Sequence, residues 1–119
     1  MAVQRKKMRE PSDENALDKQ KMRDLENKIN LEVGSFLVLI EEGTEEQADL
    51  AKIRAKSEYL KFGPEMQKLA FKLGSRFPEA VDDYLDSIDA IVHSSLSWVD
   101  ESTVAAYCHT MQNLEDLLQ

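Results

Sequence analysis

FPEAVDDYLDSIDAIVHSSLSWV, residues 77–99, is the longest segment of the chain with one clear apolar face. At about 100° per residue, its apolar side chains fall in an arc of roughly 120°, the width typical of a helix that packs against a core. The members of this arc are Val81, Tyr84, Leu85, Ile88, Ile91, Val92, Ser95 and Val99. The stretch therefore predicts an amphipathic helix that organises the rest of the fold.

Beside the apolar arc, Asp82, Asp86 and Asp89 fall in a second arc of roughly 60° that also contains His93. We call these three aspartates the acidic stripe. We expect the stripe to meet a basic surface on a partner, because complementary charge speeds and selects an encounter. The alternative is a solvated face that keeps the protein soluble. Trp98, at the edge of the apolar arc, is either a core residue or an interface anchor.

The segments on either side of this stretch also have helical patterns. Ser12 is an expected N-cap, and apolar residues from Met22 to Ile40 recur at spacings of three and four up to Gly43. Thr44 and Gln47 have the spacing of a capping box for a second helix, which we expect to end at Gly63–Pro64. A short helix over 64–73 and a last helix after residues 100–103 follow. The sequence predicts an all-α bundle of four long helices and one short helix.

Two of these helices carry a second apolar stripe. Leu31 and Val38 lie opposite the main stripe of the first helix, and Leu50, Ile53 and Leu60 lie apart from the alanine-rich stripe of the second. A helix that is apolar on two sides is either central in the fold or covered by another molecule. We therefore expect these five residues to bind a partner protein or a second copy.

The 119 residues fit one domain, which we place at 12–119 after a mobile basic arm at 1–11. The net charge is −8, yet residues 77–119 hold nine acids and neither lysine nor arginine. The body of the domain is therefore expected to repel nucleic acid. The longest apolar run, residues 36–40, is too short for a membrane span, and the basic N-terminus lacks a following apolar segment. These features predict a cytoplasmic protein.

Candidate chemistry is sparse. Residues 82–86, DDYLD, resemble the aspartate-rich motif of isoprenoid synthases, where carboxylates one turn apart bind magnesium and a diphosphate, but no second acidic motif occurs. Asp89 and His93 could share a metal, although His109 is the only other histidine. The single cysteine, Cys108, excludes an internal disulfide and lies on the apolar stripe of the last helix. We expect no cofactor, no metal and no catalytic site.

The leading hypothesis is a non-enzymatic binding module: a small acidic adaptor, assembly chaperone or complex subunit. Its partner is another protein with a basic surface, a second copy, or both. A helical docking box, LEDLL at residues 114–118, is a further candidate element. The alternatives are a regulator that imitates nucleic acid and, from the acidic stripe with His93, a metal-dependent helical-bundle enzyme.

Overall fold

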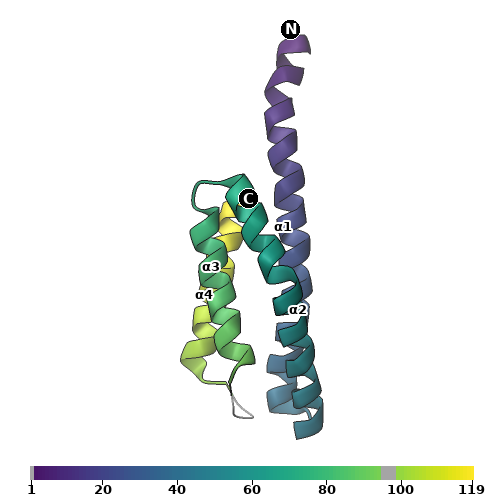
Figure 1. Cartoon of the computed structure of the whole chain (residues 1–119), viewed down its shortest axis with the longest axis vertical. Coiled ribbons are helices and arrows are strands. Elements are labelled where there is room, and N and C mark those ends of the chain that lie inside the picture. The colour runs from purple at the N-terminus through teal and green to yellow at the C-terminus, as the bar shows by residue number, and fades with distance from the viewer. Residues whose placement is uncertain (1, 95–98) are drawn as a thin grey trace.

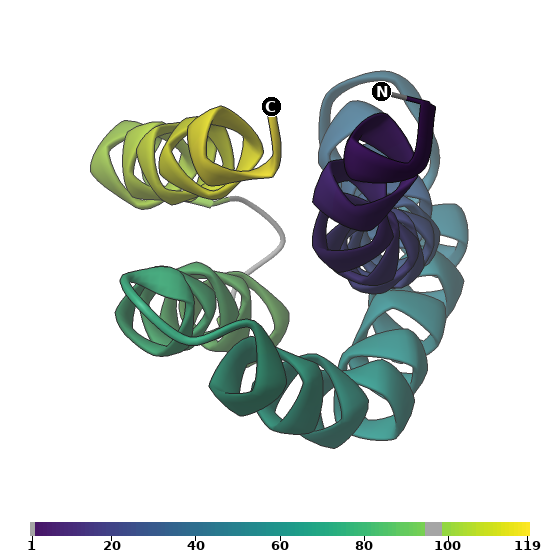
Figure 2. The same ribbon diagram turned by 90° about the horizontal axis from the view of Figure 1, so that it is seen from above.

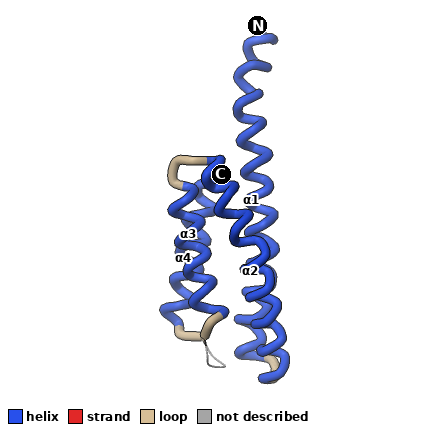
Figure 3. The backbone as a smooth tube through the Cα atoms, viewed as in Figure 1, coloured by secondary structure: helices blue, strands red, loops and turns tan. Residues whose placement is uncertain are grey.

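The computed structural model describes residues 2–94 and 99–119, with side chains from residue 16 onward. Within these residues the chain forms four helices and no strand (Figure 3). The helices are α1 (Ala2–Glu42), α2 (Glu45–Leu73), α3 (Phe77–Val92) and α4 (Glu101–Leu118). The predicted all-α class is confirmed. None of the described helices combines the length and apolarity needed to cross a membrane.

The helices pack in chain order around one core. α1 and α2 form an antiparallel hairpin, and α3 and α4 form a second one (Figure 1). α2 curves from α1 toward α3, so that it lies beside α1 at its start and beside α3 at its end (Figure 2). The N-terminal part of α1 extends beyond the bundle, which is why the molecule measures 62 × 21 × 21 Å.

Short sequence motifs that mark the ends of helices are confirmed at both ends of α2. The Thr44 hydroxyl accepts a hydrogen bond from the Gln47 backbone N–H at 3.1 Å, and the Gln47 side chain accepts one from the Thr44 backbone N–H at 2.9 Å. This is the predicted capping box, with Glu45 and Glu46 at the positive end of the helix dipole. At the other end of α2, Gly74 adopts a φ of 72°. That left-handed conformation favours glycine.

The predicted break at Gly63–Pro64 is wrong, because α2 continues through both residues. Proline lacks a backbone N–H, so the helix loses one hydrogen bond at this point. The apolar face nevertheless runs on across the proline, and Phe62, Met66 and Ala70 are all buried in the core. Burial of these side chains outweighs one lost hydrogen bond. The bundle therefore has four helices in its described residues instead of the expected five.

Two predicted boundaries also differ. α1 already begins at Ala2, so a separate arm at residues 1–11 is not confirmed. α3 ends at Val92, although we expected it to end near Trp98. The His93 backbone N–H bonds to the Asp89 carbonyl and closes the last turn, and the next residue, Ser94, has a low helix propensity. Trp98 and Ser95 lie outside the described residues.

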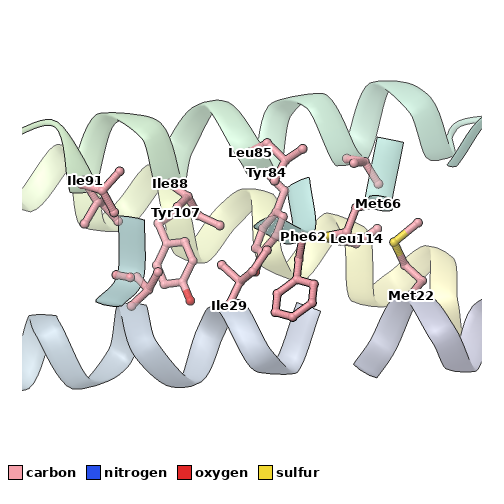
Figure 4. Packing of buried hydrophobic residues seen from close by; sticks show 14 of the residues in the cluster. Met22, Ile29, Phe62, Met66, Tyr84, Leu85, Ile88, Ile91, Tyr107 and Leu114 are labelled. Carbon is pink, nitrogen blue, oxygen red and sulfur yellow. The ribbon is translucent and has the colours of Figure 1, made fainter. Parts of the chain in front are cut away.

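The core forms between the predicted apolar arc of α3 and the facing sides of the other helices (Figure 4). All six members of the arc within α3 are buried: Val81, Tyr84, Leu85, Ile88, Ile91 and Val92. In α4, Tyr107, Leu114 and Leu118 are buried but Cys108 is exposed, so its predicted place in the core is wrong. Two leucines of the LEDLL segment thus belong to the core.

Gly63→Ala is expected to change the unfolding free energy by less than about 1 kcal/mol, because the backbone entropy that alanine saves in a helix is opposed by contact of its Cβ with the ring of the following Pro64. A Cβ at this position would lie 3.6 Å from Leu85 Cδ2, an ordinary packing distance. Urea denaturation measures the change in unfolding free energy. Gly43→Ala is the contrasting variant: its Cβ would lie 2.8 Å from Gln47 Oε1, which accepts the hydrogen bond of the capping box, and 3.0 Å from the Leu39 backbone carbonyl oxygen, so it should destabilise by more. A loss of several kcal/mol for Gly63→Ala would contradict this account of the helix interior.

Candidate protein-interaction surface

The structure leaves the second stripes of α1 and α2 facing outward. All five predicted side chains are more than half exposed, from 53% for Val38 to 72% for Leu31. The main stripes of both helices face the core, and no segment of the described chain covers the outer side. Burial of these residues within their own chain, one of the two expected explanations, is therefore excluded. The set is Leu31, Val38, Leu50, Ile53 and Leu60.

Two more exposed apolar residues were missed in the sequence. Leu17 is 66% exposed and Phe71 is 76% exposed, the highest value among the large apolar side chains described. Both continue a spacing that was already visible, since Leu17 precedes Leu31 by two heptads and Phe71 follows Leu50 by three. All seven large exposed apolar side chains in the described residues belong to α1 and α2, and none to α3 or α4.

The four exposed residues of α2 lie on one side of the helix. We call Leu50, Ile53, Leu60 and Phe71 the outer stripe. At about 100° per residue, they fall within an arc of roughly 100° opposite the buried Ala51 and Ala55. Val38 lies five residues before Gly43 and Leu50 lies six after Thr44, so the hairpin brings α1 and α2 apolar residues to the same level. Both helices of the hairpin thus present exposed apolar side chains.

The acidic stripe is only partly free. Asp86 is exposed, but Asp82 accepts a hydrogen bond from Gln67 of α2 at 3.3 Å. Asp89 is hydrogen-bonded to Tyr59 of α2; burial first, and then the charge of Asp89, raise the pKa of the Tyr59 hydroxyl. The stripe therefore runs along the contact between α2 and α3, where two of its carboxylates already have partners in the chain.

His93 and Asp89 do come together, with 2.9 Å between His93 Nδ1 and Asp89 Oδ1. His109 lies on the exposed side of α4. No group of three or more histidine, cysteine, aspartate or glutamate side chains in the described residues has a geometry that could hold a metal ion. The contact is a one-turn ion pair near the end of α3, and it is half exposed.

A buried polar cluster between α1, α3 and α4 was not predicted. The Asn30 side-chain carbonyl accepts hydrogen bonds from the hydroxyls of Tyr84 and Tyr107, the second at 2.6 Å. The two tyrosine rings lie 6.2 Å apart, and Tyr107 reaches toward α1 (Figure 4). The Asn30 amide in turn bonds the carboxylate of Glu26. The cluster therefore links α1 to both helices of the second hairpin.

Glu26 is the unusual member of this cluster, because a carboxylate at 2% exposure has lost nearly all its water. Its Oε2 atom has no hydrogen-bond partner among the described residues. Burial, and next the negative charge of Glu115, raise the pKa of Glu26 to about 7, while Asn30 and Arg23 act in the opposite direction. Arg23 also donates to the Leu118 carbonyl. The cluster can take up a proton near neutral pH, but it shows no nucleophile or ligand set for catalysis.

A signal for Glu26 is present in the sequence. It lies four residues after Met22 and three before Ile29, on the apolar side of α1, where a charged residue is unexpected.

Comparison with known proteins adds no functional information: no protein-family model, curated protein or solved structure matches this chain.

Proposed function

We propose that this protein is a non-enzymatic protein-binding module, such as an adaptor, assembly chaperone or complex subunit, and that it binds through the outer side of the α1–α2 hairpin. One observation carries the proposal: among the residues that the structure describes, seven large apolar side chains are more than half exposed, and all seven are on this hairpin. Scattered apolar residues are normal on protein surfaces, but an aligned set marks an interaction site.

The outer stripe is suited to a helix-on-helix contact. Leu50, Ile53 and Leu60 stand at spacings of three and seven, which places them on one side of α2, one turn and then two turns apart. Covering apolar surface stabilises a complex by about 25 cal/mol for each Å² removed from water. The stripe can therefore supply binding energy without any change in the fold of the hairpin.

The acidic stripe has the lesser role in this proposal. Asp86 is exposed and, unlike Asp82 and Asp89, forms no hydrogen bond to α2 among the described residues. An exposed carboxylate mainly affects the rate and the salt dependence of an encounter with a partner. We propose that it selects among partners that are held chiefly by the apolar side chains.

The double variant Ile53→Asp with Leu60→Asp is expected to lose its partner while keeping its fold, because both side chains are exposed and make no core contact. Loss of at least tenfold in affinity is expected, since two buried apolar contacts are replaced by desolvated charges. The measurement is co-purification from the organism that encodes the protein, with mass spectrometry of the bound proteins and circular dichroism as the fold check.

Cys108→Asp is the matched control, because it places an aspartate at an exposed helical position of α4 outside the hairpin. The control should retain every partner that the wild-type protein binds. Retention of the same partners by Ile53→Asp with Leu60→Asp would contradict the proposal.

A further inference from the structure

We propose that the outer stripe binds an acidic amphipathic helix of a partner protein, packed along α2 in the manner of a coiled coil. The inference rests on the proposed function and names the class of partner that its surface fits. It depends on two features of α2, the spacing of the outer stripe and the charge of the residues that flank it. It also depends on a comparison with the described helices that a second copy would present.

The spacing is that of a coiled-coil seam. Positions 50, 53, 57, 60, 64, 67 and 71 alternate steps of three and four, so they correspond to a and d of consecutive heptads. Four of the seven positions hold the large, exposed apolar residues of the outer stripe; the others are Ser57, Pro64 and Gln67. The seam spans 22 residues, about 30 Å of helix. This length corresponds to three heptads of a partner helix.

The flanks of the seam are basic. The e positions, one residue after each d, are Arg54, Lys61 and Lys68, and all three are exposed. On the other side the g positions include Asp49 and Lys56, while the remaining ones are buried against the core. Residues at e and g determine which helices pair in a coiled coil. On the g side, α3 adds the carboxylate of Asp82, which is bonded to Gln67 of the seam at 3.3 Å. The three cations of the e side therefore favour a partner whose facing flank carries glutamate or aspartate.

The basic flank continues across the neighbouring groove. Lys68 and Lys72 line a groove of about 450 Å³ between α1 and α2, together with Lys21 and Lys28 of α1 and the acids Asp24 and Glu65. Lys72 is already paired with Asp18 at 3.6 Å. The groove therefore adds only a small net positive charge along the side of the seam that faces α1, and the preference for acidic residues rests mainly on the e positions.

A second copy does not provide such a helix. If two α2 helices paired antiparallel along the whole seam, Arg54 would face Lys68 of the second copy and Lys61 would face Lys61, so like charges disfavour this arrangement. If they paired parallel, Lys56 would face Lys61 but Asp49 would face Arg54, so these pairs offset each other and give no net attraction. The acidic part of the chain, residues 77–119, has no large exposed apolar side chain in its described residues to fill the seam. α1 of a second copy has only Leu17, Leu31 and Val38 as large exposed apolar residues in the described chain, spaced two heptads and one heptad apart, too few to fill a seam of three heptads. The occupant we propose is therefore a different protein.

Two synthetic 22-residue peptides test this preference: both carry leucine at a and d, one with glutamate and the other with lysine at e and g. We expect the acidic peptide to bind at least tenfold more tightly in fluorescence anisotropy, and to weaken as sodium chloride is raised from 50 to 300 mM. The variant with Arg54→Glu, Lys61→Glu and Lys68→Glu should reverse the preference. Arg5→Glu with Lys6→Glu and Lys7→Glu makes the same change in net charge elsewhere and should preserve it.

Equal binding of both peptides, or of neither, would overturn the inference, as would an unchanged preference in the Arg54, Lys61 and Lys68 variant. A concentration-dependent dimer that dissociates on Ile53→Asp with Leu60→Asp would overturn it too, because a second copy would then occupy the seam. The proposed function survives each of these results if that double variant still loses its native partner. The proposed function itself fails if Ile53→Asp with Leu60→Asp retains the native partner.

Discussion

Glu26→Gln is expected to make the protein about 3 kcal/mol more stable than the wild type at pH 8, and to leave stability nearly unchanged at pH 4. Burial and the charge of Glu115 raise the pKa of Glu26 from 4.5 to about 7 in the folded protein. Between these two values the folded state keeps a proton that the unfolded state has lost, so wild-type stability falls as pH rises. Above pH 7 both states are ionised and the full destabilisation remains.

Urea denaturation of both proteins from pH 4 to pH 8 measures this difference. Comparing the two at each pH removes the contribution of the other carboxylates. Glu115→Gln is the control, because it removes a charge that helps to raise the pKa of Glu26. In this variant, the pH range over which the free energy of unfolding falls should therefore end at a lower pH than in the wild type. A stability difference between Glu26→Gln and wild type that is the same at pH 4 and pH 8 would show that Glu26 does not ionise in the folded protein as described.

Asn30→Ala is expected to destabilise the protein by about 3 kcal/mol, because a buried hydroxyl without an acceptor costs about 1–3 kcal/mol. The substitution removes the acceptor of Tyr84 and Tyr107, which are 0% and 5% exposed. Tyr84 retains only a long contact of 3.4 Å to the Glu26 carbonyl oxygen. Loss of the Asn30 amide also raises the pKa of Glu26 further. The urea midpoint at pH 6 measures the effect.

Tyr84→Phe with Tyr107→Phe in the Asn30→Ala background provides the control. If unsatisfied hydroxyls cause the loss, removing them should recover a large part of it, since replacing both partners of a hydrogen bond is close to neutral. The three substitutions would then be strongly non-additive. Purely additive losses would instead indicate that Asn30 acts by packing and that the hydrogen bonds contribute little.

Sequence reasoning succeeded where the cause of a structure is local. The Thr44 capping box and the end of a helix at Leu73 depend on a few neighbouring residues, and both appear as expected. The apolar arc of α3 was also correct, because a helix with a single apolar side has only one way to face a core. Errors arose where local signals competed with packing. Gly63–Pro64 reads as a helix end, yet the buried residues on both sides of it hold α2 together.

The buried cluster was missed for a similar reason. Nothing in α1 alone shows that Glu26 and Asn30 meet Tyr84 and Tyr107, which are more than 50 residues away in the chain. Only the docking of α1 against the second hairpin places these groups together. The raised pKa of Glu26 is therefore a property of the tertiary structure, since it results from lost water and the nearby Glu115.

By itself, the sequence determined that the chain is helical, where several helices begin and end, and that α1 and α2 each have two apolar sides. It could not determine which of the two apolar sides of α1 and α2 is buried, because burial depends on which segments pack against it. The tertiary structure decided that point: the core takes the side with Ile29 and Ala51, and leaves Leu31, Ile53 and Leu60 exposed. The candidate surface is thus what remains after α3 and α4 have covered the other side of the hairpin.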